Sequence, residues 1–249
     1  MTERKKVVVV GLGEIGKPLF ELVAQQHEAV GVDLAPPASR VERPDFMHVC
    51  YPFQIRDFVG ETARYIELLH PAVTIINSTV SIGITRTIAE RTGVPVVNSP
   101  VRGKHARMVE DLRRYIKFVG AIEPEVGRSV VDHFESFGLK AKLLSSPEAT
   151  ELAKLTETTY FGLMIAWAQE VERYCDRTGQ NYEEIVSFYD EIGFFPPVKY
   201  FPGTIGGHCV MPNIEILRNF EPSQLLDAIR ASNEMKKERE AKREIEAIA

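Results

Sequence analysis

The sequence predicts an α/β protein in which a doubly wound parallel sheet is followed by a smaller, all-helical domain. Short β-branched runs alternate with helical patterns as far as residue 146, which is typical of βαβ units. After Ser145-Ser146-Pro147 the helical pattern continues without further strands. We therefore expect one domain over residues 1–146 and a helical one over residues 147–249, with a long connecting helix.

The first predicted strand and the turn after it carry a dinucleotide-binding pattern. Residues 7–10 are all valine, as expected of a buried parallel strand. The next residues form G-x-G-x-x-G: Gly11, Leu12, Gly13, Glu14, Ile15 and Gly16. In this pattern the glycines permit a tight turn, a close phosphate and close helix packing, and the helix N-terminus faces the pyrophosphate. We therefore expect residues 1–146 to be a Rossmann-type domain that binds NAD.

The second predicted strand favours NAD over NADP because it ends in an acid. Asp33 follows the apolar run 29–32 and is placed to accept hydrogen bonds from the adenosine ribose. Arg40 and Arg43, in the proline-rich loop that follows, leave an alternative open. They could contact the 2′-phosphate of NADP, or they could be solvated surface arginines.

Further strands are predicted at residues 45–51, 72–76, 94–97, 115–120 and 140–144. Helices are predicted at residues 56–69 and 124–137, and another, capped by Thr85, is expected to end at Arg91. Ligands bind at the carboxyl ends of such strands. The cofactor contacts expected there are Tyr51, Pro52, Ser78 and Thr79.

Cationic residues cluster after the predicted strand at residues 94–97. Arg102, Lys104 and His105 could bind an anionic substrate at the edge of a pocket. They could equally form a solvated charged face.

The long helix predicted after Pro147 places Glu151, Lys154 and Thr158 on one face, at positions i, i+3 and i+7. Lys154 lies among apolar neighbours, so a partly desolvated ammonium is one interpretation. An ordinary Glu–Lys surface pair is the other.

The stretch Gly206-Gly207-His208-Cys209 is a candidate nucleophile motif. Paired glycines let a ligand come close to the backbone, and a thiol beside an imidazole can be activated. The alternative is a buried Cys209 at the start of a helix over residues 213–220. Beyond Asn233 the sequence is rich in Lys, Glu and Arg, which predicts a solvated final helix.

Composition excludes several classes of protein. A net charge of −5 argues against general nucleic-acid binding. No apolar run approaches the roughly 20 residues that span a membrane. The first residues lead directly into a predicted strand, so we expect no signal peptide. The 3 cysteines are too widely spaced for a disulfide framework or a zinc site. We expect a cytoplasmic protein without a bound metal.

Together these motifs resemble the nucleotide-sugar dehydrogenases, which oxidise UDP-glucose, UDP-N-acetylmannosamine or GDP-mannose. The glycine turn, Asp33 and residues 77–80 resemble the family's cofactor motifs, and Glu151-x-x-Lys154 resembles its catalytic helix. Gly206-Gly207-His208-Cys209 resembles its Gly-Gly-x-Cys motif, in which the cysteine carries a thioester. The resemblance implies an NAD-dependent dehydrogenase that forms a homodimer through its helical domain.

The chain departs from that family at several positions. Thr158 and Asn213 stand where the family usually has Asn and Asp. Pro100-Val101 replaces Pro-Glu, without the acid that assists thioester hydrolysis, and Pro100-Val101-Arg102-Gly103 is similar to Pro-Val-Ser-Gly of the β-hydroxyacid dehydrogenases. The family's third, nucleotide-binding domain is expected to be absent, so we expect nucleotide sugars to bind poorly to this chain alone.

The sequence thus predicts an NAD-dependent oxidoreductase acting on a polar alcohol or aldehyde, which would be anionic if the cationic cluster binds it. Lys154 would act on the substrate oxygen, His208 and Cys209 would form the substrate wall, and Thr158 and Asn213 would complete the catalytic set. A two-electron hydroxyacid dehydrogenase without covalent cysteine chemistry is an alternative. A non-catalytic NAD-binding regulatory protein is another.

Overall fold

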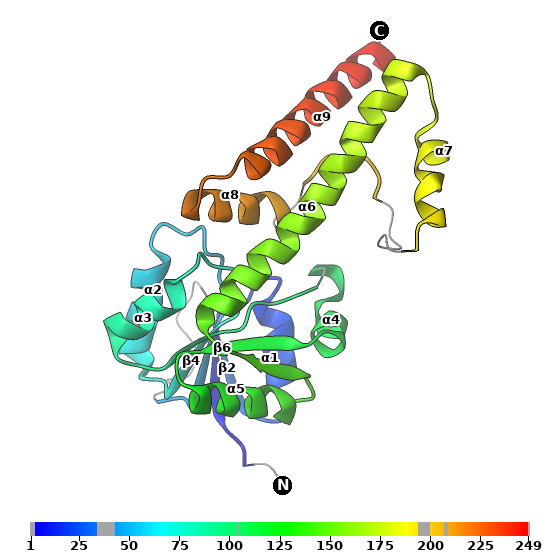
Figure 1. Cartoon of the computed structure of the whole chain (residues 1–249). Coiled ribbons are helices and arrows are strands. Elements are labelled where there is room, and N and C mark those ends of the chain that lie inside the picture. The colour runs from blue at the N-terminus through cyan, green and yellow to red at the C-terminus, as the bar shows by residue number, and fades with distance from the viewer. Residues whose placement is uncertain (1–2, 34–42, 104, 194–199, 207–208, 249) are drawn as a thin grey trace. The chain divides into compact units, whose positions relative to one another are not determined.

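The computed structural model describes residues 3–33, 43–103, 105–193, 200–206 and 209–248. The chain divides into two compact units, residues 1–154 and residues 155–249. Figure 1 shows the sheet in the first unit and the helices of the second.

A seven-stranded sheet forms the centre of the first unit, in the order β2-β1-β3-β4-β5-β6-β7. The strands are β1 (Lys6–Val10), β2 (Glu28–Val32), β3 (Phe46–Val49), β4 (Val73–Ile76), β5 (Val96–Asn98), β6 (Lys117–Ala121) and β7 (Ala141–Leu144). This arrangement confirms the predicted Rossmann-type fold. The strand order reverses between β1 and β3, which is where such sheets bind ligands.

One strand pair departs from the predicted parallel sheet, because β6 pairs antiparallel with β5. The connection between them contains η1 (His105–Arg107) and α4 (Met108–Arg114), a helix that the sequence analysis did not predict. The chain therefore re-enters the sheet at the edge where β5 ends, which produces an antiparallel neighbour.

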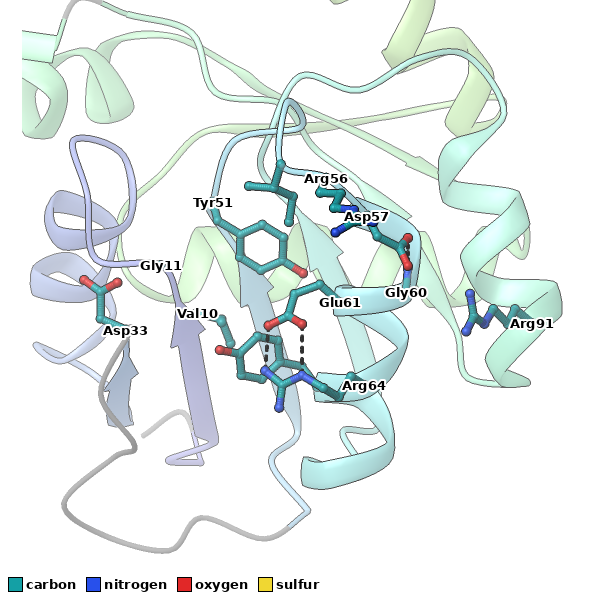
Figure 2. A pocket seen from close by; sticks show the side chains of 12 residues that line it. Val10, Gly11, Asp33, Tyr51, Arg56, Asp57, Gly60, Glu61, Arg64 and Arg91 are labelled. Atoms are coloured by element: carbon teal, nitrogen blue, oxygen red, sulfur yellow. Dashed lines mark hydrogen bonds and ion pairs between the residues drawn. The ribbon is translucent and has the colours of Figure 1, made fainter.

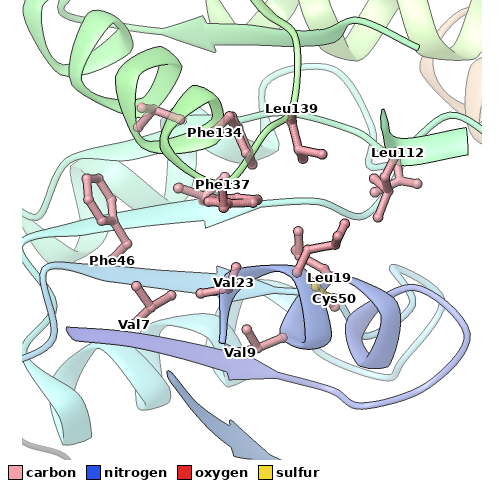
Figure 3. Packing of buried hydrophobic residues seen from close by; sticks show 14 of the residues in the cluster. Val7, Val9, Leu19, Val23, Phe46, Cys50, Leu112, Phe134, Phe137 and Leu139 are labelled. Carbon is pink, nitrogen blue, oxygen red and sulfur yellow. The ribbon is translucent and has the colours of Figure 1, made fainter. Parts of the chain in front are cut away.

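Helices cover both faces of this sheet because successive strand residues point to opposite sides. Val7 and Val9 pack in a core with α1 (Gly16–Val23), α4 and α5 (Pro124–Ser136), as Figure 3 shows. Val8 and Val10 pack in a second core with α2 (Phe58–Leu69) and α3 (Ile84–Thr92). Cys50 also lies buried in the first core.

The second unit is helical. It contains most of α6 (Pro147–Thr178), α7 (Tyr182–Ser187), η2 (Phe188–Glu191), α8 (Val210–Phe220) and α9 (Gln224–Ile248). Its main core joins Ala166 of α6 to Ile205, Ile214 and Ile229. A Cβ at Gly162 would lie 2.8 Å from Val210 Cγ1, so α8 packs closely on α6.

The described residues of α9 beyond Asn233 are mostly exposed, as predicted, with Lys236 as the exception. Asn233 and Lys236 are buried, and Lys236 Nζ lies 2.7 Å from Glu172 Oε2 on α6. The charged residues on this face of α9 bind partners on α6, which hydropathy alone does not reveal.

A chain of buried polar side chains crosses the first core. Lys117 on β6 donates hydrogen bonds to Asn77 Oδ1 (3.1 Å) and to the Ser99 carbonyl. Asn77 Nδ2 lies 3.2 Å from His48 Nδ1, and His48 Nε2 lies 3.0 Å from His133 Nε2.

These contacts set the tautomers of both imidazoles. Asn77 Oδ1 accepts from Lys117, so its amide nitrogen donates to His48 Nδ1. His48 then carries its proton on Nε2 and donates to His133 Nε2. The remaining proton lies on His133 Nδ1, an atom without a hydrogen-bond partner among the described residues. Both rings are neutral, because burial lowers the pKa of His133 and lowers that of His48 to about 3.

Among the described residues, no helix has both the length and the apolar character needed to cross a bilayer.

We expect the free energy of unfolding to rise between about pH 7.5 and 9.5. Burial lowers the pKa of Lys117 to about 7 in the folded chain, against roughly 10.4 in an unfolded one. In this window the unfolded chain binds a proton that the folded chain lacks, so stability rises with pH, approaching about 1.4 kcal/mol per unit. Urea denaturation at several pH values measures the slope of the free energy of unfolding against pH for the wild type and for Lys117→Met. Equal slopes would contradict this assignment.

Candidate functional site

The turn between β1 and α1 is a steric cradle made by three glycines. Gly11 has φ +88°, and a Cβ there would lie 2.8 Å from Tyr51 N. A Cβ at Gly16 would overlap the Gly11 carbonyl oxygen. At Gly13, by contrast, a Cβ would meet no described atom within 4 Å. The outer two glycines are thus required by packing, whereas Gly13 faces open space.

This geometry fits a dinucleotide. Helix α1 begins at Gly16 with Ile15 at its N-cap, a residue whose side chain has no hydrogen-bond acceptor. Its first turn also contains no acid, so backbone N–H groups and the positive end of the helix dipole can face an anion. The open side of Gly13 is where a phosphate can approach. Leu12 packs on β2, where a Cβ at Gly31 would lie 2.7 Å from its Cδ1, and Glu14 is exposed.

A cavity of about 640 Å³ opens beside this turn, a size in the range of small-molecule sites. Figure 2 shows Asp33 on one side of it and residues of α2 on the other. Its lining residues are Val10, Gly11, Asp33, Tyr51, Ile55, Arg56, Asp57, Gly60, Glu61, Arg64, Tyr65 and Arg91. The cavity lies at the carboxyl ends of β1 and β2, where Asp33 is expected to meet a ribose.

The sequence analysis missed the contribution of α2 to this cavity. Asp57 caps α2 by accepting a hydrogen bond from Gly60 N (2.8 Å). Arg64 donates to both Glu61 oxygens (2.9 and 2.6 Å), and its guanidinium lies 4.4 Å from the centre of the Tyr65 ring. The position of α2 in the sequence could have predicted this contribution. Because α2 begins shortly after β3, its N-terminus lies near the carboxyl ends of the strands, where ligands bind.

The expected contacts after β3 and β4 are tied together by hydrogen bonds. Ser78 Oγ is buried and donates to the Tyr51 carbonyl (2.5 Å), and Tyr51 OH pairs with Thr62 Oγ1 (2.6 Å). Burial raises the pKa of Tyr51, so its hydroxyl stays protonated. Pro52 is exposed and Thr79 is half-buried. Ser78 therefore fixes the backbone at the cavity wall.

Arg43 lies at the amino ends of the parallel strands, whereas Asp33 lies at their carboxyl ends. Its N–H donates to the Leu69 carbonyl (2.8 Å) just before β3, whereas Asp33 follows β2. These strands run parallel, and five residues of strand are about 16 Å long. Contact of Arg43 with a ribose at Asp33 is thus contradicted by the topology. Arg40 lies outside the described residues.

The cationic cluster after β5 is described only in part. The Arg102 guanidinium lies 5.6 Å from the Tyr115 ring centre and 5.7 Å from that of Phe118. Arg102 is half-buried. A wholly solvated face is therefore wrong for Arg102. Lys104 and the side chain of His105 lie outside the described residues.

Glu151 has a different role from the predicted surface pair. It is 1% exposed and accepts hydrogen bonds from Gly83 N (2.7 Å), Thr85 N (3.0 Å) and Thr85 Oγ1 (2.6 Å). Burial is the main cause that raises the pKa of Glu151. Thr85 was predicted to cap α3, but Gly83 holds the N-cap position and the carboxylate of Glu151 binds the N–H groups. Glu151, near the start of α6, therefore anchors α3.

Lys154, one turn further along α6, is half-buried, as the desolvated interpretation requires. It lies close enough to the core for its charge to contribute to the lowered pKa of Lys117, after the larger effect of burial. Lys154 thus stands near the β5–β6 edge of the first unit.

In the second unit the structure brings Thr158 and Asn213 together. Asn213 is buried, and its Nδ2 donates to Thr158 Oγ1 (3.0 Å). Cys209 is exposed at the N-cap of α8, which begins at Val210 and not at residue 213 as predicted. The alternative of a buried structural Cys209 is therefore wrong. His208 lies outside the described residues.

Comparison with known proteins agrees with this geometry. The sequence profile of the UDP-glucose/GDP-mannose dehydrogenase family, central domain, matches residues 148–235. The resemblance predicted from the sequence is thereby confirmed.

UDP-N-acetyl-D-mannosamine dehydrogenase from Methanocaldococcus jannaschii is 22% identical over an alignment 255 residues long, gaps included, which covers 83% of this chain. The match covers 60% of that relative, so this chain spans well under its full length.

Two solved structures share the fold. UDP-D-ManNAc dehydrogenase from Pyrococcus horikoshii matches with a TM-score of 0.83 at 20% identity, covering 97% of this chain and 71% of that one. 3-Hydroxyisobutyrate dehydrogenase from Mycobacterium tuberculosis matches with a TM-score of 0.71 at 17% identity, covering 96% and 94% of the two chains. At such identities these matches establish fold alone.

Within the described residues, no group of three or more His, Cys, Asp or Glu side chains is arranged to hold a metal ion.

We expect Glu151→Gln to lower the free energy of unfolding by about 2 kcal/mol. The variant loses a charged acceptor, and its amide NH₂ group would face one of the backbone N–H donors of Gly83 and Thr85. Glu148→Gln is the matched control, since Glu148 lies one turn earlier and pairs with the more exposed Arg86 (2.7 Å). Its cost should be about 0–1 kcal/mol. Urea denaturation measures both, and equal costs would contradict the anchoring role.

Proposed function

We propose that this chain is an NAD-dependent oxidoreductase that oxidises the hydroxyl group of a polar, anionic substrate. The glycine cradle beside the Asp33 cavity carries the proposal, because it combines an anion-binding helix end with an acceptor for a ribose. The central-domain match supports the dehydrogenase chemistry. Bound NAD would supply a hydride acceptor.

Lys154 is proposed as the group that acts on the substrate hydroxyl. Its half-buried amine donates a hydrogen bond to the substrate oxygen or takes the hydroxyl proton as the C–H hydride leaves. This step alone converts an alcohol to an aldehyde or ketone, with two electrons transferred.

Cys209 is proposed as the nucleophile of a second oxidation. Its exposed sulfur adds to the aldehyde carbon, and the thiol proton passes to the aldehyde oxygen. Loss of a hydride from that carbon and of the hydroxyl proton then gives a thioester, for which a second NAD would supply the hydride acceptor. Water then cleaves the C–S bond, which releases the acid and restores the thiol. We propose that the Thr158–Asn213 hydrogen bond holds α8 and α6 together next to this residue.

A two-electron hydroxyacid dehydrogenase is the second candidate. The observation that favours it is Pro100-Val101-Arg102-Gly103, which is similar to Pro-Val-Ser-Gly of the β-hydroxyacid dehydrogenases. In this case Arg102 would bind the substrate carboxylate and Cys209 would not react. A purely NAD-binding regulatory protein would differ from both by forming no NADH with any substrate.

The names of the relatives suggest UDP-N-acetylmannosamine, a polar alcohol with an anionic diphosphate, as the first compound to test. Weak binding of nucleotide sugars to this chain stays a prediction. Calorimetry with UDP-N-acetylmannosamine tests it, and a micromolar dissociation constant would contradict it.

We also propose a homodimer formed through the helical unit. Tyr160, Trp167 and Tyr174 follow one another at seven-residue spacing along α6 and are 53%, 55% and 49% exposed. Such a stripe suits helix–helix association. Light scattering should give twice the chain mass for the wild type and for the control Phe188→Glu, but the chain mass for Trp167→Glu. A wild-type monomer would contradict the proposal.

The cofactor assignment predicts that a side chain at Gly13 weakens NAD binding without changing the stability of the fold. Gly13→Ala should retain the wild-type melting temperature, because its Cβ enters open space, but weaken NAD binding about tenfold or more by blocking the phosphate. Gly193→Ala, whose Cβ also meets no described atom within 4 Å, is the control and should bind NAD normally. Calorimetry measures both.

Asp33 should set the preference for NAD over NADP, because its carboxylate repels a 2′-phosphate. Calorimetry should therefore show the preference reduced in Asp33→Ala. Tighter NADP binding by the wild type would overturn the assignment, as would an unchanged preference in the variant.

Lys154→Met tests the step that the two candidate reactions share, and Cys209→Ser separates the two reactions. Lys154→Met should slow NADH formation by roughly 100-fold or more in either reaction. Cys209→Ser should abolish acid formation in the four-electron reaction but retain most of the rate in the two-electron reaction. The measurement is NADH absorbance with mass spectrometry of the product. A normal rate in Lys154→Met would contradict the role of the lysine.

A further inference from the structure

The backbone of Ile205, four residues before Cys209, is held by one side chain of the C-terminal helix. Asn233 Oδ1 accepts the Ile205 N–H (2.7 Å), and Asn233 Nδ2 donates to the Ile205 carbonyl (2.9 Å). Asn233 is fully buried and Ile205 is 2% exposed. An amide side chain thus gives this irregular segment the paired hydrogen bonds that a neighbouring strand would give.

A second amide holds the same segment from α6. Gln169 is fully buried, and its Nε2 donates to the Gly203 carbonyl (2.8 Å) and to Asn233 Oδ1 (3.3 Å). Ser232 Oγ donates to Gln169 Oε1 (2.9 Å), which fixes the orientation of that amide. Two helices therefore hold the stretch from Gly203 to Ile205 through side chains without net charge.

The chain is anchored again immediately after Cys209. Val210 and Ile214 of α8 lie in the same core as Ile205, and Gly162 lets α8 lie close to α6. In the sequence, Cys209 therefore lies between Ile205, which Asn233 binds, and the packed start of α8.

We propose that Asn233 is a positioning residue for Cys209: it holds the Ile205 backbone and so sets where the thiol lies. Gln169 supports Asn233 in this role. The inference deepens the proposed function and rests on it only in treating Cys209 as a reacting group. Displacement of a reacting group by about 1 Å can cost on the order of 100-fold in rate. Asn233 acts on the reaction through the backbone alone.

The first test compares Asn233→Ala with Lys236→Met in the full chain. Both remove a buried polar contact of α9, but only Asn233 binds Ile205, whereas Lys236 binds Glu172. Amide hydrogen exchange at Ile205 should rise about tenfold or more in Asn233→Ala and stay at the wild-type rate in Lys236→Met. Equal exchange in the two variants would overturn the clamp.

Cysteine labelling reports on the thiol itself. Iodoacetamide should modify Cys209 at an altered rate in Asn233→Ala, with the rate in Lys236→Met unchanged and with Cys50 and Cys175 still protected by burial. The dissociation constant for NAD should match that of the wild type, since the clamp lies in the second unit. An unchanged Cys209 rate in Asn233→Ala would overturn the positioning role.

Asn233→Asp supplies a rescue that depends on pH. A protonated carboxyl can accept from Ile205 N–H and donate to its carbonyl, whereas a carboxylate can only accept. The ratio of variant to wild-type exchange at Ile205 should therefore approach one as the pH falls and increase as it rises. A ratio independent of pH would overturn the proposal. These exchange readouts require no turnover, so they stand apart from a failure of the proposed dehydrogenase activity.

Discussion

The close contact between the start of α1 and the end of β1 is the constraint on which the first unit depends. A side chain at Gly16 would overlap the Gly11 carbonyl, and one at Gly11 would strike the backbone at Tyr51. With both positions limited to glycine, the helix N-terminus lies at the carboxyl edge of the sheet. The neighbouring Gly13 then leaves an open approach to its N–H groups. The cavity bordered by Asp33 lies beside the same turn.

The elements that the sequence predicted are those whose pattern is local. All-valine β1 and the alternation of strands and helices indicate a parallel sheet without reference to distant residues. The antiparallel β6 could not be predicted this way, because strand direction depends on where the connection through α4 re-enters the sheet. Likewise the burial of Lys117 in β6 could not be predicted, because the groups that accept its hydrogen bonds, on Asn77 and Ser99, are far away in sequence.

The candidate site divides in the same way. The glycine turn, Asp33 and Cys209 were found from spacing, since each stands in a short motif. Glu151 and Asn233 act through residues 66 and 28 positions away, so the sequence showed an exposed acid on a helix face and the start of a solvated helix. In both cases a polar side chain replaces missing backbone partners, at the start of α3 and along the segment before Cys209. Long-range hydrogen bonds of this kind leave no periodic signal.

Titration of isotope-labelled protein with NAD, followed by amide NMR, tests the central claim most directly. The account predicts that the largest shifts fall on the amides of Gly13, Glu14, Ile15 and Gly16, with further shifts at Asp33 and around Tyr51, and that they saturate together. Shifts confined to other parts of the chain, or unchanged spectra at millimolar NAD, would contradict the assignment of this turn as the dinucleotide site.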